Sequence, residues 1–228
     1  MMKVLGVIVG LSLLIALPAW AGDVTLKSDD EKMMYLIGVV TARNLGVYDF
    51  NESELAIVEE GLKDATLGRP MKMEIQIDHK KSNEFLQRRK QQAAEGEKKA
   101  SAEFLKKAAT EEHMVVKKSG LLYKEIKPGK GPHPSDLGTF KVKYKGMLRD
   151  GSVFDSTDPP KAPVTYTTGQ LVPCWDEAVR LMSPGGKSKF ICPPDLAYGK
   201  NGNLPMIKPW AVLVFEVELL EVSTPNPK

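Results

Sequence analysis

Residues 139–145 read Thr-Phe-Lys-Val-Lys-Tyr-Lys, so that Phe140, Val142 and Tyr144 alternate with lysines. Such alternation is typical of a strand in an antiparallel sheet that has one buried and one solvated face. Further strands are predicted over residues 120–126, 152–155, 164–167, 187–192 and 211–222. Pro173, which suits the first turn of a helix, predicts a short helix over residues 173–182. Strands and helices do not alternate along residues 115–228, so the pattern predicts an α+β module of about 110 residues.

The chain before residue 115 has helical rather than alternating periodicity. Ser28 with Glu31, and Asn51 with Glu54, each fit a capping box that begins a helix. Apolar residues follow both starts at helical spacing, namely Met33, Leu36, Ile37 and Val40, then Leu55, Val58, Leu62 and Ala65. Two short amphipathic helices cannot bury these faces alone, so they need each other, the next helix or a second copy of the chain.

Residues 71–114 predict one long helix. Residues 71–112 contain no proline and are dominated by Lys, Glu, Gln and Ala, which are strong helix formers. The segment would be roughly 60 Å long, and its sparse apolar residues favour a solvated spacer. A sustained coiled coil would need apolar heptads, and a nucleic-acid patch would not interleave acidic residues.

The composition and the N-terminus indicate an exported protein. A composition of 42% hydrophobic and 27% charged residues excludes a collagen-like or wholly disordered chain, and a net charge of +3 does not indicate a nucleic-acid partner. Lys3, an apolar run from Val4 to Leu17 and Ala19-Trp20-Ala21 form the pattern of a cleavable signal peptide. A membrane anchor is the alternative, although the run is shorter than the ~20 residues of a spanning helix. The mature chain would then have no transmembrane span.

No pattern of covalent or metal-dependent catalysis is present in the sequence. The three histidines lack metal-ligand spacing, and there is no GxSxG, P-loop or CxxC motif, so we expect neither a metal nor a cofactor. Instead, aromatic residues are distributed over the elements of the second half: Tyr144, Phe154, Tyr166, Trp175, Tyr198 and Phe215. Taken singly, core packing explains each of them.

The residues around these aromatics change that interpretation. They form ordered blocks: Val142-Lys-Tyr-Lys-Gly-Met-Leu148, Gly151-Ser-Val-Phe-Asp-Ser156, Val172-Pro-Cys-Trp175, Asp195-Leu-Ala-Tyr-Gly199 and Leu213-Val-Phe-Glu-Val-Glu-Leu219. Together the blocks resemble FKBP-type peptidyl-prolyl cis-trans isomerases over residues 115–223. Tyr35-Leu-Ile-Gly38 and Glu60-Gly-Leu-Lys-Asp64 more loosely resemble the N-terminal domain of macrophage-infectivity-potentiator-like periplasmic FKBPs.

This resemblance implies a domain organisation. It comprises a signal peptide over residues 1–21, a helical dimerisation domain over 22–70, a long connecting helix over 71–114 and an isomerase domain over 115–228 with a short C-terminal tail. The isomerase domain would be an antiparallel half-barrel sheet wrapped on a short helix. The chain would form a homodimer in the periplasm or outside the cell, where it could associate with the cell surface.

The resemblance also implies a non-covalent site in an apolar pocket. The expected catalytic residues are Tyr144, Phe154, Asp155, Trp175, Tyr198 and Phe215, and the expected substrate contacts are Tyr166, Leu171, Val172 and Ile207. Trp175 would form the pocket floor, and the Tyr198 hydroxyl would donate to a substrate carbonyl. Asp155 would be a polar group at the rim, hydrogen-bonded to Tyr144, unless it is only a turn residue. Residues 200–210 would overhang the pocket and contact the residue before proline.

The implied activity is isomerisation of X–Pro bonds in unfolded or partly folded exported proteins, with macrolide inhibitors as candidate ligands. The alternative is a binding chaperone that keeps the fold with marginal isomerase activity. Three positions depart from the family pattern. Val164 replaces an aromatic, Cys174 replaces the usual Gly before the tryptophan, and Lys208 replaces the first Pro of an Ile-Pro-Pro loop ending. Substrate preference and macrolide affinity therefore stay open.

Cys174 and Cys192 are the two cysteines of the chain. They are expected at the start of the short helix and at the end of the strand after it, and the turn over residues 183–186 reverses the chain between them. Export to an oxidising compartment favours a disulfide between them. The alternative is a pair of small buried thiols.

Overall fold

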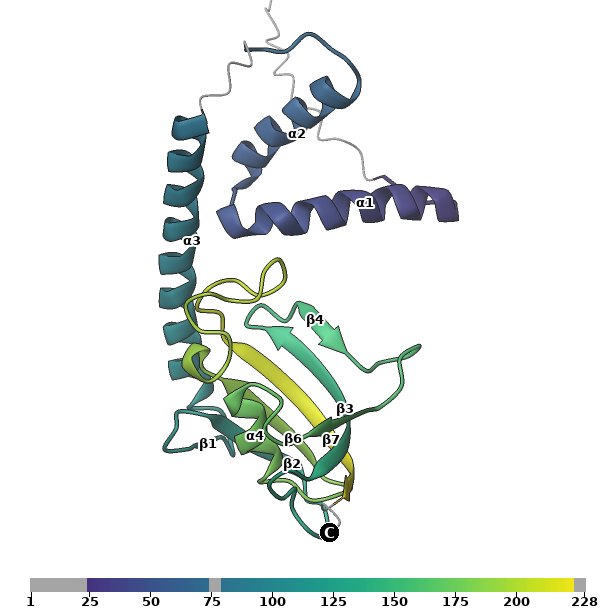
Figure 1. The fold of residues 1–228 in the computed structure, drawn as a ribbon, viewed down its shortest axis with the longest axis vertical. Coiled ribbons are helices and arrows are strands. Elements are labelled where there is room, and N and C mark those ends of the chain that lie inside the picture. Colours follow the sequence, from purple (N-terminus) through teal and green to yellow (C-terminus); the bar gives the residue numbers. More distant parts are fainter. Residues whose placement is uncertain (1–23, 74–78, 224–228) are drawn as a thin grey trace, which may run out of the picture. The chain divides into compact units, whose positions relative to one another are not determined.

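The computed structural model describes residues 24–73 and 79–223, which are drawn in colour in Figure 1. The expected signal peptide, residues 1–21, lies outside the described residues. The chain divides into two compact units, residues 1–39 and residues 40–228. Helix α1 (Asp29–Leu45) crosses this boundary, and all later elements belong to the second unit.

Both predicted capping boxes are present. At the start of α1 the Ser28 N–H donates to the Glu31 carboxylate at 2.9 Å, and the Glu31 N–H donates to Ser28 Oγ at 3.2 Å. After the 3₁₀ helix η1 (Gly46–Tyr48), Asn51 and Glu54 cap α2 (Glu52–Thr66) by two reciprocal bonds of 3.0 Å. Helix α1 buries no residue and α2 buries only Asp64, so the apolar faces predicted from the sequence are exposed.

Helix α3 (His79–Ala108) is shorter than the helix expected over residues 71–114. Residues 71–73 are not helical, residues 74–78 are outside the described ranges, and the chain turns after Ala108. The helix is therefore about 45 Å long. It also differs from a solvated spacer, because it buries Ser101 and Ala108 near its C-terminal end.

The second half forms an antiparallel sheet in the order β1-β2-β6-β7-β3-β4, with β5 paired to β3. Its strands are β1 (Val115–Val116), β2 (Leu122–Lys127), β3 (Thr139–Leu148), β4 (Val153–Ser156), β5 (Val164–Thr167), β6 (Lys187–Cys192) and β7 (Leu213–Ser223). Helix α4 (Pro173–Val179) and the 3₁₀ helix η2 (Pro194–Leu196) complete the unit. The two-residue strand β1 was not predicted, and α4 ends three residues before the expected Met182.

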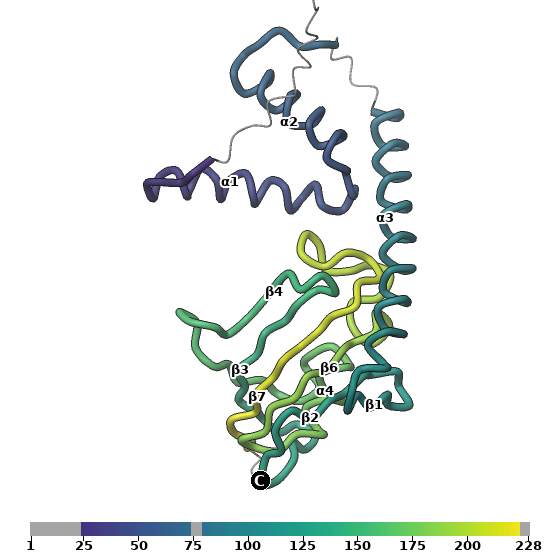
Figure 2. The backbone as a smooth tube through the Cα atoms, turned by 180° about the vertical axis from the view of Figure 1, so that it is seen from behind, coloured from purple at the N-terminus to yellow at the C-terminus, as the bar shows by residue number. Residues whose placement is uncertain are grey.

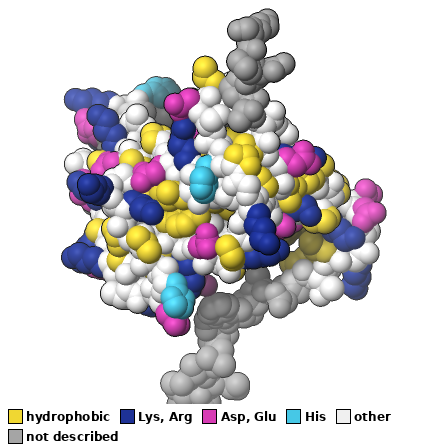
Figure 3. Space-filling view, turned by 90° about the horizontal axis from the view of Figure 1, so that it is seen from below, with side chains coloured by type: hydrophobic (Ala, Val, Ile, Leu, Met, Phe, Trp, Pro, Cys, Tyr) yellow, Lys and Arg dark blue, Asp and Glu magenta, His cyan; other side chains and the backbone are white. Residues whose placement is uncertain are grey.

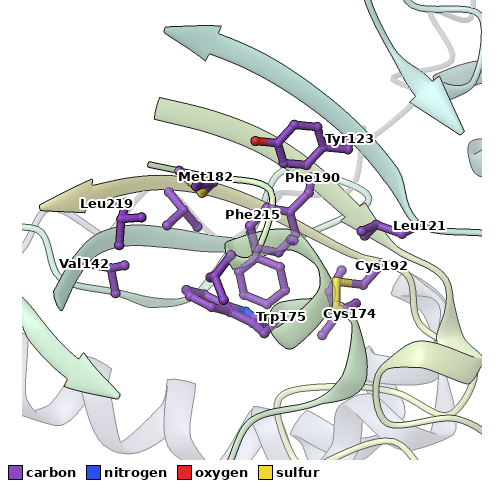
Figure 4. Close-up of a cluster of buried hydrophobic side chains, with 14 of the residues drawn as sticks. Leu121, Tyr123, Val142, Cys174, Trp175, Met182, Phe190, Cys192, Phe215 and Leu219 are labelled. Atoms are coloured by element: carbon purple, nitrogen blue, oxygen red, sulfur yellow. A yellow bond between two sulfur atoms is a disulfide. The ribbon is translucent and has the colours of Figure 1, made fainter. Parts of the chain in front are cut away.

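The sheet has apolar clusters on both faces, because successive side chains of a strand point to opposite sides. Phe190 of β6 joins the cluster around α4 with Trp175 and Phe215, as Figure 4 shows. Its neighbour Ile191 joins the other cluster, in which Ala108 of α3 takes part. In Figure 2 the lower end of α3 accordingly lies beside the sheet. The sheet is thus covered by α4 on one face and by the end of α3 on the other.

Cys174 and Cys192 form a disulfide with a Cα–Cα distance of 5.7 Å. Both cysteines are fully buried, and the bond links α4 to the end of β6 (Figure 4).

The face of the molecule seen from below is mixed in charge. Figure 3 shows basic and acidic side chains interspersed with apolar ones on the face seen from below. Among the residues that the structure describes, no helix combines the length and the apolar character needed to cross a membrane.

Reduction of the disulfide should lower the melting temperature. The bond joins residues 18 apart, and in the chain-entropy model a loop of this size contributes about 3 kcal/mol to the free energy of unfolding. Thermal unfolding followed by circular dichroism, with and without a reductant, measures the change. A Cys174→Ala/Cys192→Ala variant is the control, because its melting temperature should be the same with and without the reductant. Two titratable thiols in denatured, unreduced protein would contradict the prediction.

Candidate active site

A cavity of about 450 Å³ opens between α4 and the strands β3, β4, β5 and β7. Its lining combines apolar aromatic rings with a few polar groups: Tyr144, Phe154, Asp155, Tyr166, Gln170, Leu171, Val172, Trp175, Tyr198 and Phe215. A concave, mostly apolar site with few polar groups is the usual form of a ligand pocket.

Trp175 lies where α4 meets the sheet and is only 4% exposed. Pro173 begins the helix, and the Trp175 N–H donates to the Val172 carbonyl at 2.9 Å, which fixes the indole in the first turn. Its ring is edge-on to Tyr144 at 5.4 Å and to Phe215 at 5.2 Å between centroids. Aromatic pairs favour this geometry, so the indole is a rigid base for the cavity.

The polar side of the cavity is a hydrogen-bonded group. The Tyr144 hydroxyl donates to the Asp155 carboxylate and lies 3.2 Å from the Tyr166 hydroxyl. Lys161 donates to the other Asp155 oxygen at 2.9 Å. Asp155 lies in β4 rather than in a turn, and four side chains from different segments, its own included, form a connected rim.

Two pKa values follow from this rim. Burial, together with the hydrogen bond to Asp155, raises the pKa of Tyr144 far above its ordinary value. Burial alone would raise the pKa of Asp155, but the hydrogen bonds from Tyr144 and Lys161 outweigh it and lower that pKa. At neutral pH the pocket thus presents a neutral phenol and an ionised carboxylate.

The segment before α4 forms another wall. The Asp176 carboxylate accepts the Gly169 N–H at 2.9 Å, which holds residues 170–172 beside the cavity. Leu171 and Val172 were expected there, whereas Gln170 was not. Its position directly before Leu171 was the available signal, but a single glutamine in a loop carries no pattern.

Tyr198 and Ile207 lie in the loop that follows η2. Tyr198 lines the cavity and is 37% exposed. Ile207, the remaining expected substrate contact, is 3% exposed and packs in the core cluster rather than in the cavity lining. Its backbone pairs with that of Asn203.

Gly146 explains how two pocket rings reach their positions. It lies in β3 opposite Phe215 and Asp155. A Cβ atom at Gly146 would lie 2.7 Å from Phe154 Cζ and 3.0 Å from Phe215 Cε1. Those two rings contact edge-on at 5.7 Å, so the bare backbone at Gly146 makes room for the pair.

The site offers no ligand set for a metal ion. Across the two described ranges, no three His, Cys, Asp or Glu side chains lie close enough to hold one. The chemistry available to the lining is therefore apolar enclosure, hydrogen bonding and one fixed carboxylate.

The comparisons with known proteins agree with this geometry. Residues 130–220 match the family model for FKBP-type peptidyl-prolyl cis-trans isomerases, and residues 30–124 match the model of the domain amino-terminal to that isomerase. The FKBP-type peptidyl-prolyl cis-trans isomerase FkpA of Escherichia coli strain K12 is 32% identical over 227 residues, 93% of this chain and 83% of FkpA.

Two further similarities extend over most of the chain. The outer membrane protein MIP of Legionella longbeachae is 32% identical over 238 residues, 98% of both chains. The crystal structure of FkpA from Escherichia coli covers 89% of this chain and 100% of its own, with a TM-score of 0.59 and 30% identity.

Gly146→Ala should disturb the Phe154–Phe215 pair. The added methyl group would overlap both rings, and overpacking of this kind costs about 1–3 kcal/mol of the free energy of unfolding. Near-ultraviolet circular dichroism reports the displaced rings, and chemical denaturation reports the stability. Gly96→Ala is a matched control, because its Cβ meets no atom within 4 Å and a helical Gly→Ala change stabilises. Two unchanged measurements for Gly146→Ala would contradict the prediction.

Proposed function

The chain belongs to the FKBP-type peptidyl-prolyl cis-trans isomerase family and is such an isomerase, and we propose that its reaction takes place in the aromatic cavity. The proposed catalytic residues are Tyr144, Phe154, Asp155, Trp175, Tyr198 and Phe215. Tyr166, Leu171 and Val172 would contact the substrate, and Ile207 would support the loop from the core. The observation that carries this assignment is that all six of the proposed catalytic residues line one cavity.

Rotation of an X–Pro bond needs no covalent intermediate. The barrier of ~18–20 kcal/mol comes from the loss of amide resonance. The planar amide is more polar than the twisted one, so a dry apolar site disfavours the ground state relative to the transition state. A differential stabilisation of ~5 kcal/mol would accelerate the reaction several thousandfold. The rigid Trp175 floor and the aromatic walls would supply that environment around the proline ring.

The polar groups would orient the peptide. The Tyr198 hydroxyl would donate to a substrate carbonyl, because Tyr198 combines a place in the lining with partial exposure. The Asp155 carboxylate would act on the twisted amide from a position fixed by Tyr144 and Lys161. Since the pKa of Asp155 is lowered and that of Tyr144 is raised, neither group would change its charge between about pH 5 and pH 9.

The natural substrates would be proline-containing, unfolded or partly folded exported proteins. We propose cleavage of a signal peptide after Ala21 and a location in the periplasm or outside the cell. The disulfide supports export, since such bonds persist in oxidising compartments. A relative is named an outer membrane protein, which supports an association with the cell envelope.

We also propose that residues 22–70 form a dimerisation domain, which α3 connects to the isomerase domain at 115–228. In the dimer, a second copy of the chain would cover the exposed apolar faces of α1 and α2. Their large apolar side chains are widely exposed, for example Met34 at 67% and Leu62 at 58%. Faces of this kind are unstable in water without a partner.

Variants of the pocket should distinguish the contribution of the Trp175 floor to activity from that of the Tyr198 hydrogen bond. Trp175→Ala should lower kcat/KM at least tenfold by opening the floor. Tyr198→Phe should lower it by only about two- to tenfold, since one hydrogen bond contributes ~0.5–1.5 kcal/mol. A proline-limited peptide isomerisation assay on the mature protein measures both, and melting temperatures show whether each variant is folded.

Tyr123→Phe is a matched control for Tyr198→Phe. It removes the buried bond of 2.7 Å between the Tyr123 hydroxyl and Ser188, away from the cavity. It should lower stability and leave kcat/KM unchanged. Wild-type activity that survives Trp175→Ala in a folded protein would refute the proposed site, and a marginal wild-type rate would favour the binding chaperone.

Light scattering should give the mass of a dimer for the mature chain. Leu62→Glu should convert it to a monomer, because a charge would be buried in the proposed interface. Val116→Glu, at an equally exposed position on β1, should leave the dimer intact. A monomeric wild-type chain at micromolar concentration would rule out the dimer.

A further inference from the structure

Lys208 makes a contact that the family pattern does not provide. It stands where the usual Ile-Pro-Pro loop ending has its first proline. Its Nζ lies 2.7 Å from the carboxylate of Asp49, a residue 159 positions earlier in the chain. The contact thus joins the loop after η2, whose Tyr198 lines the cavity, to the segment between η1 and α2.

Asp49 is itself held in a fixed position. Arg89 of α3 donates to the backbone carbonyls of Tyr48 at 3.1 Å and Asp49 at 2.9 Å. The same guanidinium forms two bonds to the Glu54 carboxylate, of 3.0 and 2.8 Å. Asp49 also has a left-handed backbone with a φ of 54°, which the surrounding bonds maintain. The carboxylate that meets Lys208 is therefore anchored on α3.

Helix α3 also holds the end of the same loop. The Lys98 ammonium lies 4.7 Å from the centre of the Trp210 ring, within the range of a cation–π contact. Three residues further along α3, the Ser101 hydroxyl accepts the Val212 N–H at 3.3 Å, and Ser101 is 1% exposed. Both views of the backbone show the loop beside α3 (Figures 1 and 2).

The hairpin on the other side of the cavity is fixed by the same helix. Arg149, in the turn between β3 and β4, donates to both oxygens of Glu97 at 2.9 and 3.1 Å. The Glu97 side chain is only 10% exposed, whereas that of Arg149 is 37% exposed. Strand β4 carries Phe154 and Asp155. Residues 97–101 of α3 therefore contact both the end of the loop after η2 and the turn that leads into β4.

We propose that Asp49 and Lys208 are positioning residues of the isomerase: their ion pair holds the loop over residues 200–210 in the form that receives the peptide. This inference rests on the proposed location of the site. A loop that is already ordered loses less conformational freedom when a substrate binds. Release of the pair therefore weakens substrate binding and raises KM, while the pocket floor, and with it kcat, is unchanged.

The expected effect is modest and depends on salt. Lys208 and Asp49 are 32% and 64% exposed, and exposed pairs are screened by dissolved ions. Loss of the pair should raise KM about two- to fivefold at low ionic strength. At 1 M salt the wild type and the variants should converge, because the screening length falls to about 3 Å.

The test is a charge exchange in the full mature chain. Asp49→Lys and Lys208→Asp, made singly, should each raise KM at low salt with kcat within twofold of wild type. The double variant Asp49→Lys/Lys208→Asp restores an ion pair and should return KM to near the wild-type value. A change that only damaged folding would lower kcat and melting temperature as well, and would not be rescued by a second substitution.

Lys141→Asp is the control, because it breaks an exposed pair with Glu221 on the sheet without touching the loop. It should leave KM unchanged. Single variants with wild-type KM, or a double variant whose defects multiply instead of cancelling, would overturn the inference. If the exchange rescues KM but Trp175→Ala remains fully active, the assignment of the cavity fails instead.

Discussion

The edge-on packing of the Trp175 indole against the rings around it is the contact on which the isomerase domain depends. Four aromatic rings, three of them in the cavity lining and the fourth, Phe190, in the core, have centroids 5.2–6.1 Å from it. Helix α4 has only seven residues and could not hold an indole in place by its own stability. The disulfide at its first turn and the packing against β6 and β7 do so. The side chain that stabilises the domain is thus also the one proposed as the floor of the site.

Much of this arrangement could be predicted because it depends on short-range sequence patterns. The alternation at residues 139–145, the two capping boxes and the Pro173 start each depend on neighbours only a few positions away. The order of the aromatic blocks then indicated the family. The two-residue β1 was invisible, because Val115-Val116 is too short to show a period.

The remaining differences depend on long-range contacts. Helix α3 looked like a solvated spacer, since a serine and an alanine are what it buries and neither stands out in a charged helix. Gln170 lines the cavity without having been predicted, and Ile207 belongs to the core cluster, because the course of a loop decides which side chain faces a cavity. Asp49 and Lys208 are 159 residues apart in the chain, so no local sequence pattern could predict their ion pair.

The position of β7 has a consequence for the order in which the isomerase domain folds. It lies between β6 and β3 in the middle of the sheet, yet it is the last of the strands in chain order. A polypeptide emerges N-terminus first, so β3 and β6 have no common neighbour until the final strand arrives. Closing the sheet then joins segments about 70 positions apart, which is intrinsically slow. The cavity of an enzyme that catalyses slow steps in other chains therefore cannot be completed before its own strand β7 has been synthesised.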